Sequence, residues 1–313
     1  MSNYKVSVVI PTFNEEKTIK KLLYSLINQT EKIDEIIISD NNSTDSTKKI
    51  IESFAIKNHN IRVLDRDGIC RGSGRNQAIN NSKNDLIALI DAGTYADKNW
   101  IKNLLIKFKN GSSNFAVFGC VKIIHKNLFQ QSIAASMVPH SKENFIIDES
   151  VSSLLITKNT WKKIGKFPES KKGDYIVEDL IFIDRIKKDF KVTYSDDAYI
   201  NWLIPNNLKQ LFLRYLEYSE GGYKNGFFRK WHYGIIRNLF IFIILILISI
   251  FYNYFIFTII LLIYLRPFLY LRKKLSYKSF NFYNKAKSIL SLSYILILID
   301  LASILGIIKG SLK

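Results

Sequence analysis

The first elements of the fold are decided by the stretch Val6-Ser7-Val8-Val9-Ile10-Pro11-Thr12-Phe13-Asn14-Glu15. It opens with a run rich in valine and isoleucine, which predicts a buried strand that Pro11 ends. From Glu15 to Asn28 the apolar residues recur at spacings of three and four, which predicts an amphipathic helix. A buried strand followed directly by a helix is the building unit of α/β proteins.

The same alternation continues along the N-terminal two thirds of the chain. Further strands are predicted at Glu35-Ile36-Ile37-Ile38, Ile61-Arg62-Val63-Leu64, Leu86-Ile87-Ala88-Leu89-Ile90 and Phe115-Ala116-Val117-Phe118. The continuous apolar run at 86–90 is typical of a strand that is buried on both faces. The sequence therefore predicts an α/β domain over residues 1–205 with a mainly parallel sheet and right-handed crossovers.

The charge of the chain points to lipid rather than nucleic acid. The 313 residues carry a formal net charge of +18, and from residue 233 onward ten basic residues stand against one acid, Asp300. The sequence has no zinc-finger spacing, aromatic RNA-binding signature or basic recognition helix, which disfavours nucleic acid as a partner. Basic residues beside long apolar runs favour anionic lipid headgroups. The two cysteines, Cys70 and Cys120, give no disulfide framework and fit a reducing compartment.

The C-terminal part of the chain contains apolar runs long enough to cross a bilayer, which takes about 20 residues. We expect an amphipathic connector at 206–232 and an all-α membrane segment at 233–313, with crossings at about 235–251, 254–271 and 289–308. The basic residues at 224–230 and 272–287 should both stay cytoplasmic, so an even number of crossings must separate them. The sequence thus predicts a multi-pass protein of the cell membrane whose N-terminal domain is cytoplasmic.

Two charged positions in these runs leave alternatives open. Arg266-Pro267 lies in the second run, which could instead form an interfacial or re-entrant element. Asp300 lies in the third run. It is either a functional carboxylate or a residue satisfied near a helix end or by a neighbouring hydroxyl, and we favour the second interpretation.

Acids and guanidinium groups gather at the predicted carboxyl edge of the sheet, where α/β proteins bind ligands. Asp40 and Asp91 each follow a strand, and the glycine-rich segment between them carries Arg71 and Arg75. Carboxylates for a divalent cation and guanidinium forks for phosphate suit a nucleotide diphosphate, although each aspartate could equally form a turn or cap a helix. The chain has neither G-x-G-x-x-G after the first strand nor a P-loop, which disfavours a dinucleotide-binding domain and a P-loop NTPase.

The ordered set of motifs resembles the family 2 glycosyltransferases, which have the GT-A fold. The segments that carry the resemblance are Val8-Val9-Ile10-Pro11-Thr12-Phe13-Asn14-Glu15-Glu16, Ser39-Asp40-Asn41-Asn42-Ser43-Thr44-Asp45, Gly74-Arg75-Asn76-Gln77-Ala78, Asp91-Ala92-Gly93, Ile164-Gly165-Lys166-Phe167-Pro168-Glu169 and Glu178-Asp179. The resemblance extends over roughly residues 5–202, and the segments follow the order that the family has.

The resemblance implies a metal-dependent, inverting transfer of a sugar from a nucleotide-diphosphate sugar to a hydroxyl acceptor, such as a lipid-linked or surface-glycan precursor. It implies that Asp179 is the general base with Glu178 beside it, and that Asp91 binds Mg²⁺ or Mn²⁺ against the diphosphate. The residues it assigns to the nucleotide are Pro11, Thr12, Asn14, Glu15, Asp40, Asn41, Arg71, Arg75 and Asn76. Trp202 and Gly165 are assigned to the acceptor side.

The sequence departs from the family pattern at three places. Gly93 stands where the second metal-binding aspartate is expected, and Asn41 and Asn42 replace the usual Asp-Gly, which leaves Asp40 as the expected contact of the base. Residues 210–215 do not match the Q-x-x-R-W motif of processive synthases, so we expect transfer of a single sugar. A catalytically silent sugar-nucleotide-binding membrane protein is the alternative, and a nucleotidyltransferase is disfavoured because Glu178 and Asp179 would then lack a role.

Overall fold

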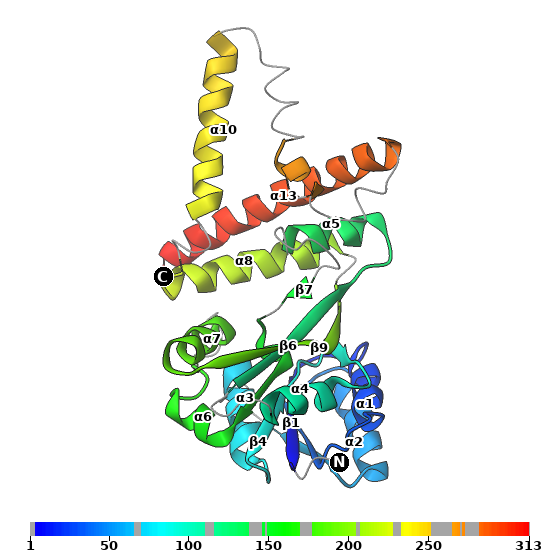
Figure 1. The fold of residues 1–313 in the computed structure, drawn as a ribbon. Helices are drawn as coiled ribbons and strands as arrows, with labels where there is room; N and C mark the ends of the chain where they lie inside the picture. Colours follow the sequence, from blue (N-terminus) through cyan, green and yellow to red (C-terminus); the bar gives the residue numbers. More distant parts are fainter. Residues whose placement is uncertain are drawn as a thin grey trace. The chain divides into compact units, whose positions relative to one another are not determined.

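The computed structural model describes residues 4–65, 70–109, 116–137, 146–147, 149–169, 177–204, 207–227, 233–251, 265–269, 271–272 and 282–312 (Figure 1). The chain forms two compact units. The first comprises residues 1–122, 147–174 and 178–203, and the second comprises residues 123–146, 175–177 and 204–313.

The predicted alternation of strands and helices is confirmed. The strands are β1 (Val6–Thr12), β2 (Glu35–Asp40), β3 (Ile61–Asp65), β4 (Leu86–Leu89), β5 (Thr94–Ala96), β6 (Ala116–Ile124), β7 (Ile146–Ile147), β8 (Leu154–Thr157) and β9 (Val192–Leu203). The helices of the first unit are α1 (Ile19–Ile27), α2 (Thr47–Lys57), α3 (Arg71–Asn81), α4 (Trp100–Lys109), α6 (Lys158–Lys163) and α7 (Glu178–Asp189), with a 3-10 turn at Val151–Ser153.

The strands form one mixed sheet in the order β3-β2-β1-β4-β8-β6-β9-β5, and β7 pairs with β6. The part of the sheet built from β3, β2, β1 and β4 is parallel, as the sequence predicts. β8 then runs antiparallel to both β4 and β6, and β5 runs antiparallel to β9. The α/β fold is therefore confirmed, and an antiparallel half follows the parallel one.

Apolar side chains fill both faces of the sheet, because successive residues of a strand point to opposite sides. Val8 and Ile10 of β1 belong to a core that also takes residues of α1, α2 and α4. Val9 belongs to a second core with residues of α3, α6 and α7. Burial on both faces explains why the parallel strands are continuous apolar runs rather than alternating ones.

The second unit is helical, as expected for the C-terminal segment. Its helices are α5 (Leu128–Met137), α8 (Leu208–Lys224), α10 (Tyr233–Phe251) and α13 (Phe282–Ser311). In the part of the chain that the structure describes, one stretch, Asn284–Ser311, is both long and apolar enough to cross a membrane, and a shorter apolar helix covers Ile235–Ile250. The predicted crossing at 254–271 lies mostly outside the described residues.

Asp300 has a partner that the sequence analysis missed. Both terminal nitrogens of Arg266 donate to its carboxylate, with Nη2 lying 3.1 Å from Oδ1. The interpretation that a helix end or a hydroxyl satisfies Asp300 is therefore wrong. A bidentate ion pair with Arg266 thus compensates the charge of the Asp300 carboxylate in an otherwise apolar helix, and such pairs are among the strong hydrogen-bonded geometries.

Candidate active site

The carboxyl ends of three neighbouring parallel strands bring predicted site residues to one edge of the sheet. Thr12 ends β1 opposite Asp40, which ends β2. β4 pairs with β1 on its other side, and Asp91 follows β4 after one residue. Parallel pairing places these three residues at the same edge, which is where α/β sheets bind ligands.

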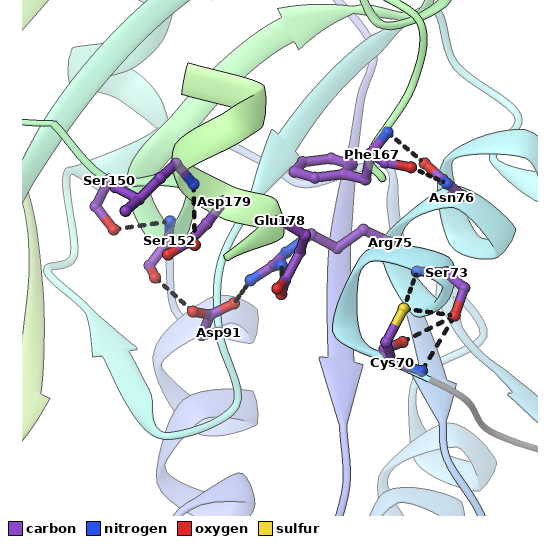
Figure 2. Close-up of polar contacts among 11 residues, drawn as sticks. Cys70, Ser73, Arg75, Asn76, Asp91, Ser150, Ser152, Phe167, Glu178 and Asp179 are labelled. Carbon is purple, nitrogen blue, oxygen red and sulfur yellow. Dashed lines mark hydrogen bonds and ion pairs between the residues drawn. The ribbon is translucent and has the colours of Figure 1, made fainter. Parts of the chain in front are cut away.

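Arg75 stands at the centre of the site. Its side chain is 2% exposed and makes two ion pairs, from Nη2 to Asp91 Oδ1 at 2.7 Å and from Nη1 to Glu178 Oε1 at 3.1 Å (Figure 2). The guanidinium group also lies 5.3 Å from the centre of the Phe167 ring. One buried cation thus joins a carboxylate at the edge of the sheet to the first turn of α7, where Glu178 precedes Asp179.

The start of α3 explains why Arg75 can be buried. Cys70 caps the helix, because its sulfur accepts from the backbone N–H of Ser73 while the Ser73 hydroxyl accepts from the backbone N–H of Cys70. Gly72 faces the loop before α7, where an added Cβ would overlap the carbonyl oxygen of Pro168 and lie 3.2 Å from Glu178 Cγ. Only glycine allows the first turn of α3 to approach this closely.

The pKa values of the two carboxylates that Arg75 holds are shifted in opposite directions. Burial alone would raise the pKa of Asp91, but the Arg75 charge and the Ser152 hydroxyl outweigh it, so the pKa of Asp91 lies below its usual value. Burial dominates at Glu178 and raises its pKa, since Arg75 offsets the burial only in part and Asp179 adds a like charge. Asp91 therefore ionises more readily than Glu178.

Ser152 is a site residue that the sequence analysis missed. Its hydroxyl donates to Asp91 Oδ2 at 2.5 Å. Ser152 lies just before β8, and because β8 runs antiparallel to β4, the residues before β8 meet the residues after β4. Looking for polar residues directly after each predicted strand identifies Asp91. It does not identify Ser152, because Ser152 precedes a strand.

Asp40 is turned toward its own loop. It is 1% exposed, and its carboxylate accepts from the backbone N–H of Ser43 at 3.0 Å and from the Ser43 hydroxyl at 2.6 Å. Among the described residues, Thr12 Oγ1 and Asn41 Oδ1 are buried side-chain oxygens without a hydrogen-bond partner. Buried polar atoms are normally satisfied, so these two oxygens mark a place where a ligand could bind.

The other predicted nucleotide residues of the first loop hold the loop itself. Asn14, at a positive φ of 53°, accepts from the backbone N–H of Thr44 at 2.8 Å. The Glu15 carboxylate accepts from the Thr18 hydroxyl at 2.5 Å and lies 3.7 Å from the point where a Cβ on Gly93 would stand. Glu15 thus faces the position of the missing second aspartate. Pro11 lies within β1, opposite Ser39, so the prediction that Pro11 ends the strand is wrong, because β1 continues to Thr12.

Asn76 is buried away from solvent and joins α3 to the loop at 164–169. Its amide nitrogen donates to the carbonyl oxygen of Phe167 at 2.9 Å and to Glu169 Oε1 at 2.7 Å. Its amide oxygen accepts from Trp161 Nε1 and from the backbone N–H of Phe167, both at 3.0 Å. All of its hydrogen-bonding capacity is used within the protein, so Asn76 positions this loop.

Arg71 and the two predicted acceptor residues belong to three different parts of the chain. Arg71 begins α3 as an exposed side chain, and its positive charge contributes to the lowered pKa of Asp91. Gly165 follows α6 with a φ of +83°, a conformation that favours glycine. Trp202 of β9 pairs with Thr94, whose hydroxyl donates to the carbonyl oxygen of Asp91 at 2.7 Å.

The residues present fit a divalent cation that binds together with a diphosphate. In the described ranges there is no group of three or more histidine, cysteine or acidic side chains that could hold a metal ion. Asp91 supplies one carboxylate, and its side chain is 33% exposed. Mg²⁺ is commonly held by one or two carboxylates, with waters and substrate phosphates completing its octahedral shell, so Asp91 suits a cation that arrives with the substrate.

Comparison with known proteins agrees with this geometry. Residues 7–160 match the model of glycosyl transferase family 2. The chain belongs to this family. Because the match begins in β1 and reaches α6, it includes the edge of the sheet that carries Thr12, Asp40 and Asp91.

The curated proteins to which this chain is similar include a polysaccharide synthase and several glycosyltransferases. The chain is 24% identical over 231 residues to a poly-beta-1,6-N-acetyl-D-glucosamine synthase of Staphylococcus epidermidis, which covers 70% of the chain and 55% of that protein. It is 41% identical over 95 residues to a poly(ribitol-phosphate) beta-glucosyltransferase of Bacillus spizizenii, covering 29% of the chain and 15% of that protein. The glycosyltransferase GlyA of Streptococcus pneumoniae is also similar, at 26% identity over 113 residues, and the chain spans 16% of its length.

Solved structures confirm the GT-A fold expected from the sequence. Crystalline S. aureus TarS in complex with UDP-GlcNAc matches with a TM-score of 0.50 at 18% identity, covering 93% of this chain and 90% of that one. The mannosyltransferase PcManGT of Pyrobaculum calidifontis, in complex with GDP-Man and Mn²⁺, matches with a TM-score of 0.54 at 12% identity, covering 96% and 88%. At these identities the likeness extends to the fold alone.

Proposed function

We propose that the protein transfers a single sugar from a nucleotide-diphosphate sugar to a hydroxyl acceptor, with inversion at the anomeric carbon. The observation that carries this proposal is the Arg75 cluster. One buried guanidinium group holds Asp91, from the edge of the sheet that would bind the donor, together with the turn of α7 that presents Asp179. Such an arrangement can hold the donor and deprotonate the acceptor within one rigid site.

The donor nucleotide would bind across the ends of β1 and β2. Thr12 Oγ1 and Asn41 Oδ1 are buried oxygens without a hydrogen-bond partner there, so they would contact the base or ribose beside Asp40. Pro11, Asn14 and Glu15 would shape the wall of this pocket. Arg71, at the exposed start of α3, would face the diphosphate.

Asp91 would hold Mg²⁺ or Mn²⁺ against the diphosphate, with Glu15 near the position of the missing second aspartate. A bound divalent cation would neutralise the negative charge that develops on the leaving diphosphate. The low pKa of Asp91 keeps its carboxylate ionised for this purpose. A single carboxylate would bind the cation only weakly in the absence of nucleotide, so the affinity for the cation should depend on the presence of the donor.

Asp179 would act as the general base, taking the proton from the acceptor hydroxyl as that oxygen attacks the anomeric carbon. The Glu178 carboxylate is held by Arg75 and would fix the first turn of α7, so that Asp179 faces the acceptor. A single displacement of the diphosphate, assisted by one base, would invert the configuration at the anomeric carbon. Gly165 and Trp202 would border the acceptor, whose class we propose to be a lipid-linked or surface-glycan precursor.

The domain division proposed for this function is a catalytic domain at 1–205, a connector at 206–232 and a membrane anchor at 233–313. The anchor would make the protein multi-pass, with its catalytic domain on the cytoplasmic side, where basic residues flank the apolar runs. This placement would bring a lipid-linked acceptor to the site.

The test uses the purified full chain in detergent with a panel of nucleotide sugars, Mn²⁺ or Mg²⁺, and lipid-linked acceptors. We expect transfer from at least one donor, and NMR of the product should show the inverted anomer. Asp179→Asn and Asp91→Asn should each lower the rate by a factor of about 10² to 10⁴. Asp184→Asn, an exposed acid further along α7, is the matched control and should retain the rate.

Two outcomes would contradict the proposal. Full activity in both Asp179→Asn and Asp91→Asn would remove the base and the metal ligand from the mechanism. Nucleotide-sugar binding, seen as a raised melting temperature, without turnover on any acceptor would instead identify a silent sugar-nucleotide-binding protein.

A further inference from the structure

The helix α13 uses one face for close packing against other helices of its own unit. An added Cβ on Gly306 would overlap the carbonyl oxygen of Leu216 in α8 and lie 2.8 Å from Ser219 Cβ. An added Cβ on Gly310 would lie 3.2 Å from the carbonyl oxygen of Glu220. Toward the other end of α13, the Ser132 hydroxyl of α5 donates to Ser291 Oγ at 3.0 Å.

The helix α8 that packs on α13 carries five charged residues. The charged residues of α8 are Lys209, Arg214, Glu217, Glu220 and Lys224. Glu220 is 1% exposed and lies between two cations, with Lys224 Nζ at 2.9 Å and Lys309 Nζ of α13 at 2.7 Å. This ion cluster fixes α8 against the C-terminal end of α13.

These contacts conflict with a membrane-crossing α13. Ser291 and Gly310 are about 29 Å apart along an ideal helix, which is about the thickness of the hydrocarbon core. A crossing α13 would therefore carry α5 and the charged α8 into the hydrocarbon beside it, and charged side chains there are costly. It would also place Asp300 and Arg266 inside the bilayer.

The opposite face of α13 is apolar and exposed. Its members recur at spacings of three and four and are each between 41% and 62% exposed: Leu290, Tyr294, Ile297, Leu301, Leu305 and Ile308. We call this set the α13 stripe. Lys285 and Lys287 lie at its N-terminal end, so positive charge borders the apolar face there, whereas Lys309 at the other end pairs with Glu220 on the packed face.

We infer that α13 lies in the plane of the membrane interface, with the α13 stripe inserted among the acyl chains and the bordering lysines at anionic headgroups. Helices with one apolar face and cationic borders bind membranes in this way. The ion clusters on the other face then stay at the level of water and headgroups, where charge is tolerated. The membrane segment would cross the bilayer within residues 235–271 alone, and both ends of α13 would be cytoplasmic. This placement extends the membrane association of the proposed function and is independent of the assigned catalytic residues.

The test is the sidedness of the two ends of α13 in the full chain, reconstituted into sealed vesicles of phosphatidylethanolamine and phosphatidylglycerol. In a Cys70→Ser/Cys120→Ser background, Asn284→Cys and Leu312→Cys are labelled separately with an impermeant maleimide. We expect both positions to react from the same side as the N-terminus. A protease site appended after Lys313, which needs no cysteine substitution, gives a second measurement of the same sidedness.

The depth of the stripe separates the remaining possibilities. Leu290→Cys, Ile297→Cys and Leu305→Cys carry a fluorophore that brominated lipids quench, and an in-plane helix gives the same shallow depth at all three. Ends on opposite sides, or a depth that is greatest at position 297, would overturn the inference. It would also fail if the three fluorophores escaped quenching while the protein ran as a dimer, because a second copy would then cover the stripe.

Discussion

Replacing Arg75 by methionine removes the cation that forms ion pairs with both Asp91 and Glu178, while keeping a side chain that fills much of the same space. Breaking a buried ion pair by removing one partner typically costs about 3 to 5 kcal/mol, because the other charge stays buried without compensation. The Glu178 side chain is 10% exposed, whereas that of Asp91 is 33% exposed and can regain water. We therefore expect a loss near the lower end, about 3 kcal/mol at pH 7.

Thermal unfolding of the full chain in detergent measures this loss, and 3 kcal/mol corresponds to a fall in Tm of about 6 to 12 °C. The deficit should shrink as the pH falls, since protonation of Asp91 and Glu178 removes the charges that Arg75 neutralises. The double variant Arg75→Met/Glu178→Gln should recover part of the loss. Arg185→Met, which removes a guanidinium group in a more exposed place, is the control and should change Tm far less.

A Tm within 2 °C of the wild type for Arg75→Met, or a deficit that does not change with pH, would refute this reasoning. Either result would mean that Arg75 does not carry the charge balance of the site.

Three further changes test other parts of the structure. Asn76→Ala leaves the buried donors of Trp161 and Phe167 without an acceptor and should lower the free energy of unfolding by about 2 to 4 kcal/mol. Asn80→Ala, at an exposed position of the same helix, is the control, and equal Tm values for the two variants would contradict this prediction. Glu178 has a pKa raised above 4.5, so its favourable contribution is complete below that pH and is lost as the pH rises through the higher folded value. The Tm of Glu178→Gln relative to the wild type should therefore increase with pH over this window, and a flat difference would count against it. Gly306→Ala forces α13 away from α8, so the Tm of the full chain should fall, whereas an unchanged Tm would show that the two helices are not in close contact.

The sequence predicts those parts of the fold that depend on local pattern. The runs Val8-Val9-Ile10 in β1, Ile36-Ile37-Ile38 in β2 and Leu86-Ile87-Ala88-Leu89 in β4 are continuously apolar because both faces of these strands are buried, and this identifies the parallel half of the sheet. The apolar spacing of α1 likewise predicts a helix with Ile19, Leu22, Leu23 and Leu26 facing the core. These features depend on residues that are neighbours in the sequence.

The features that the sequence did not predict depend on pairs far apart in the chain. The antiparallel entry of β8 brings Ser152 to Asp91, which is 61 residues earlier. The hydrogen bond between Asn76 and Phe167 spans 91 residues, and nothing near Asn76 distinguishes a positioning amide from a ligand-binding one. The catalytic and metal-binding roles of Asp179 and Asp91 remain predictions that the variants above address.

The boundary between β4 and β8 has a consequence for how such a protein could diversify. Everything proposed to bind the donor comes from the chain before Gly93, and everything proposed to meet the acceptor comes after β8 begins. Because the two strands meet through backbone hydrogen bonds, a foreign second half could be spliced in at this seam, provided that it keeps the partners of Arg75, Asn76 and Asp91 and the apolar residues of the shared core. Chimaeras joined between residues 93 and 150 should therefore keep the nucleotide preference of one parent and take the recipient preference of the other.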